Sequence, residues 1–359
     1  MMMDNPYSSM PSRAFWRSAV ADVSPLEFSG LYEPRFAITR NMPIAAAGSC
    51  FAQHIARNFK SRGYRFVQLE PSPPNLSAEQ LEQFNCEVYS ARYGNIYSIR
   101  QLVQLFQRAS GDFESCEDIW ENDGRYYDPF RPSIEPNGFA SPDELRRDRR
   151  YHLGRVKRLL HRTGLFVFTF GLTEAWVCRE DGTVLPTCPG TIAGSFDPTR
   201  YEFHNFDYNE VLADAESFIA LALDSNPGMR FLFTVSPVPL TATATQSHVL
   251  QATVYSKSVL RAVCGALYQR YGQVDYFPSY ELVASHPMRA MFFQPNLRSV
   301  SPVGVEHVMK VFFAAHSSDS DTEEVRERGR RRRRQSKSDP LSHPDDVICD
   351  EEVLESAAP

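Results

Sequence analysis

The sequence has no apolar run near the roughly 18 residues that a membrane-spanning helix needs. Its first residues, MMMDNPYSSMPSRAFW, also lack a charged region followed by an apolar stretch, which is the pattern of a secretory signal. We therefore expect a protein of the cytoplasm with no membrane span.

Cysteine occurs without the spacing of a disulfide framework or a zinc site. The number of cysteines is odd, and none form a Cys-x-x-Cys pair. Under the reducing conditions of the cytoplasm this pattern favours free thiols. We expect no metal and no cofactor. The seven cysteines are Cys50, Cys86, Cys116, Cys178, Cys188, Cys264 and Cys349.

Apolar residues are nearly missing from residues 316–359. Such a segment cannot offset the conformational entropy lost on folding, so we predict a disordered, charged tail. The basic run from Arg330 to Arg334 raises the alternative of a contact with nucleic acid or acidic lipid. No aromatic residues interleave these arginines, so a solvated tail is favoured and nucleic acid is not the expected partner.

The remaining chain can form a large core, because 42% of the 359 residues are hydrophobic. Residues 1–37 are rich in proline, serine and aromatic residues without periodicity, and we interpret them as an arm. Residues 38–315 are predicted to form one α/β domain.

Buried-strand patterns alternate with helical periodicity in this range, which predicts a parallel sheet covered on both faces. A hairpin is expected within 177–186, and an irregular insertion over 111–142. We predict strands at 44–47, 64–69, 165–170, 230–236 and 274–277, and helices from 51, over 77–110 in two pieces, over 141–162 and 209–225, from a cap at Ser247, and over 302–315.

The stretch Gly48-Ser49-Cys50 joins the first strand directly to a helix. A side chain at such a turn lies at the carboxyl end of the sheet, beside unsatisfied N–H groups and the positive end of a helix dipole. Ser49 or Cys50 would be a nucleophile there, and a thiol at a helix N-terminus needs less activation than a hydroxyl. The local pattern equally fits a small-residue turn with Ser49 as a helix cap.

Several motifs in order along residues 38–315 are together more specific than any one alone. They resemble the GSCFA family, which looks like a branch of the SGNH, or GDSL-like, hydrolase superfamily. The motifs are Gly48-Ser-Cys-Phe-Ala52, Arg92-Tyr-Gly-Asn95, Thr169-Phe-Gly171 with Trp176, Thr234-Val-Ser-Pro237, Ser256-Lys-Ser258, Tyr276-Phe-Pro-Ser-Tyr-Glu281 and Asn296-Leu-Arg-Ser299.

The resemblance implies a three-layer α/β/α domain with a mostly parallel, flavodoxin-like sheet. It also implies acyl-ester chemistry, as a hydrolase or an acyltransferase acting on an acylated carbohydrate or another small ester. Aligned on Gly48, the nucleophile of the superfamily falls on Cys50, with Ser49 as the second candidate. Cysteine there would favour acyl transfer through a thioester.

Further site residues follow from the same alignment. Gly94 matches the oxyanion glycine, and Asn95 beside it is an amide donor. Thr173 stands where the superfamily has an asparagine, so it is a weaker donor candidate. Glu174 either orients a histidine or pairs with an arginine.

The last motif departs from the superfamily, which has Asp-x-x-His there. This chain has Asn296 and Ser299 instead, so the standard base is missing, although Asn296 remains a candidate substrate-binding residue. His248, after the loop that leaves Ser236, is the best substitute base, unless it only caps its helix.

Lys257 is a further candidate base, against the alternative of a solvated helix lysine. His54, one turn beyond Cys50, is placed to modulate the thiol. If no base serves, the chain is a non-catalytic binding protein that keeps the cleft of this scaffold.

Overall fold

The computed structural model describes residues 5–316, 350 and 353–354. They belong to two compact units. The sheet unit comprises Ile38–Tyr276 together with residues 350 and 353–354, and the terminal unit comprises the described residues before Ile38 and from Phe277 to His316. The predicted single domain over 38–315 therefore spans parts of both units, and its boundaries stay a prediction.

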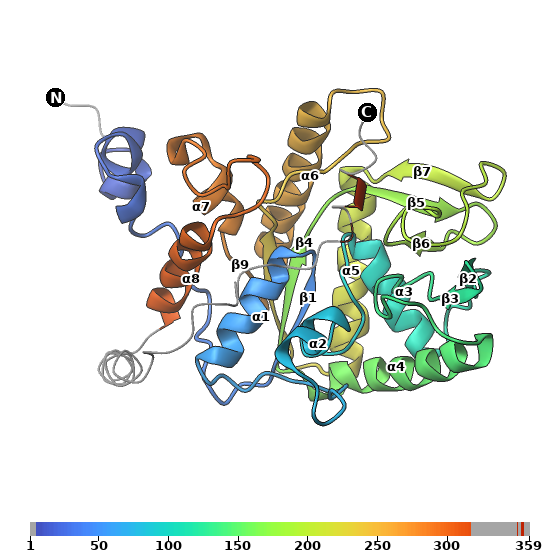
Figure 1. Ribbon diagram of the computed structural model, residues 1–359. Coiled ribbons are helices and arrows are strands. Elements are labelled where there is room, and N and C mark those ends of the chain that lie inside the picture. The colour runs from blue at the N-terminus through green and yellow to red at the C-terminus, as the bar shows by residue number, and fades with distance from the viewer. Residues whose placement is uncertain (1–4, 317–349, 351–352, 355–359) are drawn as a thin grey trace. The chain divides into compact units, whose positions relative to one another are not determined.

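A four-stranded parallel sheet forms the centre of the sheet unit (Figure 1). The strand order is β1-β4-β8-β9, with Gly48 opposite Thr169 and Phe170 opposite Val235. Every residue of β1 and β4 is buried, so both faces of these strands are covered. The strands are β1 (Ile44–Gly48), β4 (Leu165–Phe170), β8 (Arg230–Val235) and β9 (Val274–Tyr276).

Helices pack against this sheet and confirm the predicted three-layer α/β/α class. Helix α1 packs against β1 and β4, and α6 packs against β8 and β9. Phe106 of α3 and Phe218 of α5 meet Phe166 of β4 at 6.2 and 5.0 Å between ring centroids. The helices are α1 (Phe51–Ser61), α2 (Ala78–Gln83), α3 (Ile99–Ser110), α4 (Pro142–Arg162), α5 (Tyr208–Ser225) and α6 (Val249–Arg270).

Two antiparallel pieces accompany the parallel sheet in the same unit (Figure 1). The predicted insertion contains the short hairpin of β2 (Trp120–Asn122) and β3 (Arg125–Tyr127). The predicted hairpin is β5 (Glu174–Cys178) and β6 (Val184–Leu185), and β7 (Tyr201–Asn205) pairs with the other edge of β5.

The terminal unit is built from helical segments around a small aromatic core. Tyr32 lies against Phe277 and Phe312, at 5.1 and 6.1 Å between ring centroids. The segments are the 3-10 helices Ser12–Ala14, Pro25–Glu27 and His286–Met288, the π-helix Arg17–Ala21, and helices α7 (Ser279–Ala284) and α8 (Pro302–His316).

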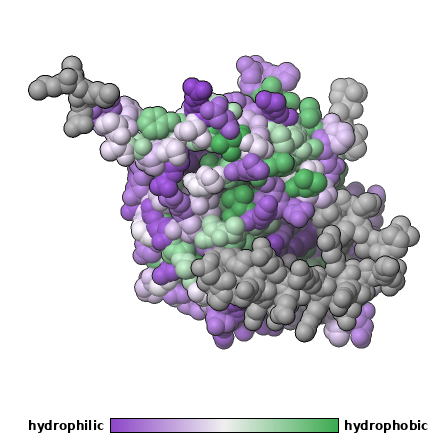
Figure 2. Space-filling model, turned by 90° about the vertical axis from the view of Figure 1, so that its left-hand side faces the viewer, coloured by the Kyte–Doolittle hydropathy of each residue, from purple (hydrophilic) through white to green (hydrophobic). Residues whose placement is uncertain are grey.

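Apolar side chains also lie on the surface of the terminal unit, among them Trp16, Leu297 and Val303. Figure 2 shows hydrophobic patches between hydrophilic residues on the face that it draws. No helix among the described residues is long and apolar enough to cross a membrane.

Two local predictions need correction, and one strand was missed. The predicted strand 64–69 is reduced to a single parallel bridge between Phe66 and Ile44, because Leu69 already bonds to the carbonyl of Ser90 and leaves the sheet. The cap of α6 is His248, one residue after the predicted Ser247. Strand β7 was not predicted.

The arginine run and all but a few residues of the predicted tail lie outside the described residues.

Candidate active site

Glycine is required where β1 turns into α1. Gly48 has a φ of 143°, which side-chain-bearing residues rarely adopt. A Cβ at this position would lie 2.6 Å from the carbonyl oxygen of Thr169 on β4, so any side chain would collide with the neighbouring strand. The tight turn places residues 49 and 50 at the carboxyl end of the parallel sheet, where ligands bind in open α/β folds.

Ser49 and Cys50 are both buried at this turn, with 3% and 4% of their surfaces exposed. Cys50 directly precedes α1, and its side chain makes no capping hydrogen bond. The Oγ of Ser49 has no hydrogen-bond partner among the described residues. Ser49 is therefore not a helix cap, and its hydroxyl is not used by any other part of the described fold.

The side-chain amide of Asn95 is held beside the turn. Its Oδ1 accepts hydrogen bonds from the Tyr89 hydroxyl at 2.8 Å and from Nε2 of Gln53 at 3.1 Å. The Tyr89 oxygen also lies 3.2 and 3.1 Å from the carbonyl oxygens of Gly48 and Ser49. Burial raises the pKa of Tyr89 well above its usual value, so the hydroxyl keeps its proton. With Oδ1 engaged, Nδ2 of Asn95 is presented as a donor.

Gly94 lies in the same loop as Asn95. Its φ is 67°, and nothing lies within 4 Å of the position that its Cβ would take. The N–H of Ile96 donates to the carbonyl of Gly48 at 2.9 Å, which ties the loop to the turn. The loop that carries Gly94 and Asn95 is thus bonded to the turn that carries the candidate nucleophiles.

The side-chain carboxyl group of Asp350, far along the sequence, accepts a hydrogen bond from the amide of Asn95. Nδ2 of Asn95 donates to Oδ2 of Asp350 at 3.0 Å, although the two residues are 255 positions apart. Asp350 is 5% exposed, and burial raises the pKa of its carboxyl. Sequence reasoning missed this contact because Asp350 belongs to no motif and lies in the predicted disordered tail.

Two neighbouring side chains of α6 hold the chain that follows β4. Nζ of Lys257 donates to the carbonyl of Gly171 at 2.5 Å, and Oγ of Ser256 accepts from the N–H of Thr173 at 3.0 Å. A Cβ on Gly171 would lie 2.9 Å from the Cβ of Ser49. With 2% of its surface exposed, Lys257 is a buried lysine near the turn rather than a solvated one.

The side chains of Thr173 and Glu174 contact neighbouring loops and strands. Oγ1 of Thr173 donates to Oδ1 of Asn205 on β7 at 2.6 Å, so its proton is committed there. The Glu174 carboxylate accepts from Oγ1 of Thr243 at 2.7 Å and from the N–H of Ala244 at 3.3 Å. Burial raises the pKa of Glu174. The contacts of Glu174 thus hold the 243–244 loop.

His248 is exposed, and its Nδ1 accepts a hydrogen bond from the N–H of Leu250 at 3.1 Å. This is the contact of a helix cap, which was the second interpretation of this residue. His54 is buried, and burial together with the charge of Arg57 lowers its pKa to about 4. At neutral pH His54 therefore carries no charge.

Asn296 and Ser299 lie in the terminal unit and bond to one another. Oδ1 of Asn296 accepts from the N–H groups of Arg298 and Ser299, both at 3.0 Å. Its Nδ2 donates to Oγ of Ser299, also at 3.0 Å. These two residues thus stabilise their own turn. His307, on the next helix, stacks on Phe292 at 4.7 Å between ring centroids.

A cavity of about 270 Å³ lies beside Asp350. Its walls are mostly apolar, and Leu354 lies at it together with Asp350. The other polar residues of the wall are Glu174, Thr187, Thr191 and Thr243. This volume and lining suit a short acyl group or a similar small apolar moiety. The apolar wall includes Leu172, Trp176, Leu185, Phe203 and Leu240.

Comparison with known proteins adds one match. The sequence model of the GSCFA family matches residues 43–312, which contain the turn at residue 48, Asn95 and Lys257. No curated protein matches the chain.

Proposed function

Since the chain belongs to the GSCFA family, we propose that it carries out acyl-ester chemistry at the Gly48-Ser49-Cys50 turn, as a hydrolase or an acyltransferase. The observation that carries this proposal is the contact between Nδ2 of Asn95 and a carboxylate oxygen of Asp350. The contact supports Asn95 as a donor to a carboxyl oxygen beside a buried nucleophile candidate, which is the role of an oxyanion donor.

The nucleophile is Cys50, with Ser49 as the alternative. Attack on the ester carbonyl forms an acyl-enzyme and releases the alcohol, and water or a second alcohol then takes the acyl group. Cys50 would form a thioester and Ser49 an oxygen ester. The buried, unpartnered Oγ keeps Ser49 in contention.

Asn95 donates to the oxyanion, and the N–H groups at the start of α1 are at the same end of the sheet. Tyr89 and Gln53 position the amide by fixing its oxygen. Thr173 is a less suitable donor, because its hydroxyl already bonds to Asn205.

The proton of the nucleophile needs an acceptor, and Lys257 is the better candidate. It is buried, and its Nζ bonds to Gly171, the residue that packs against Ser49. His248 instead caps α6 at the surface, and Glu174 holds the 243–244 loop.

The substrate proposed is a small ester whose acyl group enters the apolar cavity beside Asp350, the residue that bonds to Asn95. An acylated carbohydrate or another small alcohol ester meets this description. The carboxyl group of Asp350 competes with a substrate carbonyl for this donor, because it accepts a hydrogen bond from Nδ2 of Asn95.

The competing function is that of a binding protein that uses the same cavity without catalysis. It is favoured by the self-contained turn of Asn296 and Ser299, which leaves no acid–base pair at these positions.

The test is burst release from p-nitrophenyl acetate by the full chain and by Asp350→Ala. We expect a burst that Cys50→Ala abolishes, and a loss of about 10²–10⁴-fold in acylation rate for Lys257→Met. The acyl-enzyme should be cleaved by neutral hydroxylamine if it is a thioester. Ser49→Ala should abolish the burst in its place if serine is the nucleophile.

Matched controls separate chemistry from folding. Cys264→Ala removes another buried thiol, on α6, and Ser61→Ala removes an exposed hydroxyl on α1. Both should keep the burst. Absence of turnover across short acyl esters in the wild type and in Asp350→Ala would exclude the enzyme and leave the binding protein.

A further inference from the structure

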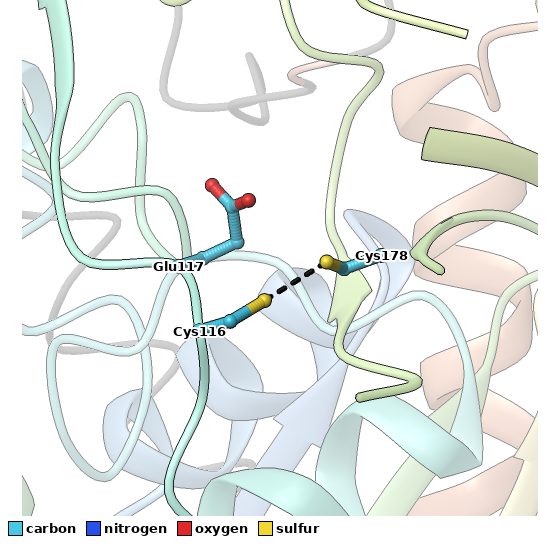
Figure 3. Close-up of side chains that lie close together, drawn as sticks. All are labelled: Cys116, Glu117 and Cys178. Carbon is cyan, nitrogen blue, oxygen red and sulfur yellow. Dashed lines mark hydrogen bonds between the residues drawn. The ribbon is translucent and has the colours of Figure 1, made fainter. Parts of the chain in front are cut away.

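Two cysteines from distant parts of the sequence meet in the sheet unit, away from the turn at residue 48. The Sγ atoms of Cys116 and Cys178 are 2.9 Å apart, although the residues are separated by 62 positions. Figure 3 shows the two sulfur atoms pointing toward one another. The sequence predicted free thiols from the odd count and the absence of a motif, and neither signal reports on such a long-range pair.

Backbone hydrogen bonds fix both thiols in place. The N–H of Cys116 donates to Oδ2 of Asp181 at 2.7 Å. The N–H of Cys178 donates to the carbonyl of Thr183, and its carbonyl accepts from Gly182. Both cysteine residues are therefore bonded to the turn at 178–183, and these bonds keep their two sulfur atoms close together.

A metal ion fits this arrangement poorly. The carboxylate of Glu117 lies within 4.8 Å of the two sulfurs, which makes the three residues a possible ligand group. Two thiolates on a tetrahedral zinc ion stand about 3.8 Å apart, well beyond the separation seen here. In Figure 3 the Glu117 carboxylate points away from the sulfurs.

The carboxylate of Glu117 is also already satisfied. Its Oε1 accepts from the guanidinium of Arg200 at 2.7 Å and from the hydroxyl of Tyr201 at 2.9 Å. Its Oε2 accepts from the indole N–H of Trp120 at 3.1 Å. A metal would have to displace these bonds, whereas a bond between the sulfurs would leave them intact.

We propose that Cys116 and Cys178 are a modification site, oxidised to an intramolecular disulfide by a low-molecular-weight disulfide such as oxidised glutathione. The more accessible thiol is Cys116, since Cys178 is only 2% exposed. The Cys116 thiolate attacks one sulfur of the oxidant and releases one glutathione thiolate. The Cys178 thiolate then attacks the Cys116 sulfur and releases the second. The two protein thiols lose two protons and two electrons, and the oxidant takes them up.

The surroundings determine how this reaction depends on pH. Burial, the hydrogen bond with Cys178 and the neighbouring Asp181 raise the pKa of Cys116. The attacking thiolate is therefore scarce near neutral pH, and the oxidation should accelerate as the pH rises. Asp181 is also the group whose carboxylate bonds to the N–H of Cys116. The guanidinium of Arg200, which bonds to Glu117, interacts electrostatically with both thiols, but the pKa of Cys116 is raised nonetheless.

The disulfide would restrain the wall of the cavity. It would join the segment before β2 to the end of β5, and the β5 residues Glu174 and Trp176 line the cavity. This consequence concerns the shape of the cavity and holds whether or not the chain is an enzyme.

The test is thiol counting on the full chain in buffers of defined reduced-to-oxidised glutathione ratio. After acid quenching and alkylation under denaturing conditions, the reduced protein should carry all seven labels. We expect the oxidised protein to lose two labels and to yield a peptide pair linked through Cys116 and Cys178. Its Tm should rise by several degrees relative to the reduced protein.

Cys116→Ser and Cys178→Ser should each lose the linked pair and the Tm shift, whereas Cys188→Ser, another partly buried single cysteine, should keep both. If a serine variant does not fold, the peptide map of the oxidised wild type still shows whether Cys116 and Cys178 are linked. Retention of all labels in oxidising buffer would overturn the proposal. So would a stable glutathione adduct on Cys116 alone, or one zinc ion per chain that protects both thiols from alkylation.

Discussion

At the scale of single residues, Gly48 sets the geometry of the candidate site. Its backbone conformation and its contact with Thr169 both exclude a side chain. We expect Gly48→Ala to lower the free energy of unfolding by about 1–3 kcal/mol for the backbone conformation alone, with a further cost for the collision with β4. Urea denaturation checks this.

Gly63 offers a matched control, because its φ is 76° and nothing lies within 4 Å of the position of its Cβ. Gly63→Ala should therefore carry only the conformational cost of about 1–2 kcal/mol. Equal losses for the two variants would mean that the contact with Thr169 does not constrain the turn.

Lys257 shows why residue-level prediction from sequence has limits. A lysine on a long helix is expected to be solvated, and the pattern of α6 contains no sign of the contrary. Its Nζ donates to the carbonyl of Gly171, which lies 86 positions away in the sequence. A contact with so distant an acceptor leaves no periodic pattern in the sequence of the helix.

At the scale of elements, α6 connects the surface to the site. Its N-terminus is capped by His248, and its first half contributes Ser256 and Lys257 to the chain that follows β4. The sequence identified this helix and most others, because their apolar faces repeat over several turns. It missed β7, whose burial is mostly partial and whose partner β5 precedes it by more than twenty residues.

The cap on α6 makes a prediction that separates two roles of His248. His248→Ala should lower the free energy of unfolding by about 1 kcal/mol, because the N–H of Leu250 loses its acceptor. His248→Asn should restore the cap and the stability. Both variants should keep the burst with p-nitrophenyl acetate. Loss of the burst in both, with a folded His248→Asn protein, would identify His248 as the base instead.

The insertion between α3 and α4 contains Cys116, and the sequence pattern gives no sign of its contact with Cys178. A disulfide between Cys116 and Cys178 would close a loop of 62 residues. By loop-closure entropy alone such a bond stabilises the fold by about 4 kcal/mol. Turn-forming residues predicted the irregular course of this segment, but the two thiols meet only once β5 is in place.

At the scale of the whole molecule, Asp350 connects the end of the chain to the candidate site. We expect Asp350→Ala to raise the kcat/KM for short acyl esters about tenfold, the effect of losing one buried hydrogen bond that competes with substrate. Asp350→Asn keeps an acceptor for Asn95 and should stay close to the wild type at low pH.

This contact should weaken as the pH rises. Burial raises the pKa of Asp350, so the attached carboxyl binds its proton more tightly than the detached one does. Attachment is therefore strongest below the usual pKa of an aspartate and declines as the pH passes through the raised value. The ratio of kcat/KM between Asp350→Ala and the wild type should be larger at about pH 5 than at about pH 8. A ratio independent of pH would contradict this assignment of the titrating group.

The alternation of strands and helices was enough to predict the parallel sheet and its two covering layers, since the central strands β1, β4 and β8 are short, mostly apolar runs. The sequence also allowed the candidate nucleophiles and Asn95 to be picked out, because they belong to motifs that follow one another in a fixed order along the chain. What remained hidden is the ligand that the chain itself supplies, since Asp350 follows a segment with no packing pattern.

A ligand that belongs to the same polypeptide behaves differently from a dissolved inhibitor. Its effective concentration is set by the tether and stays constant when the protein is diluted or dialysed. Occupancy of the Asn95 amide by Asp350 should therefore be independent of protein concentration, and only an excess of a competing small molecule would displace it. Screens for ligands of this protein would need millimolar compounds, or the Asp350→Ala variant, before weak but genuine substrates become visible.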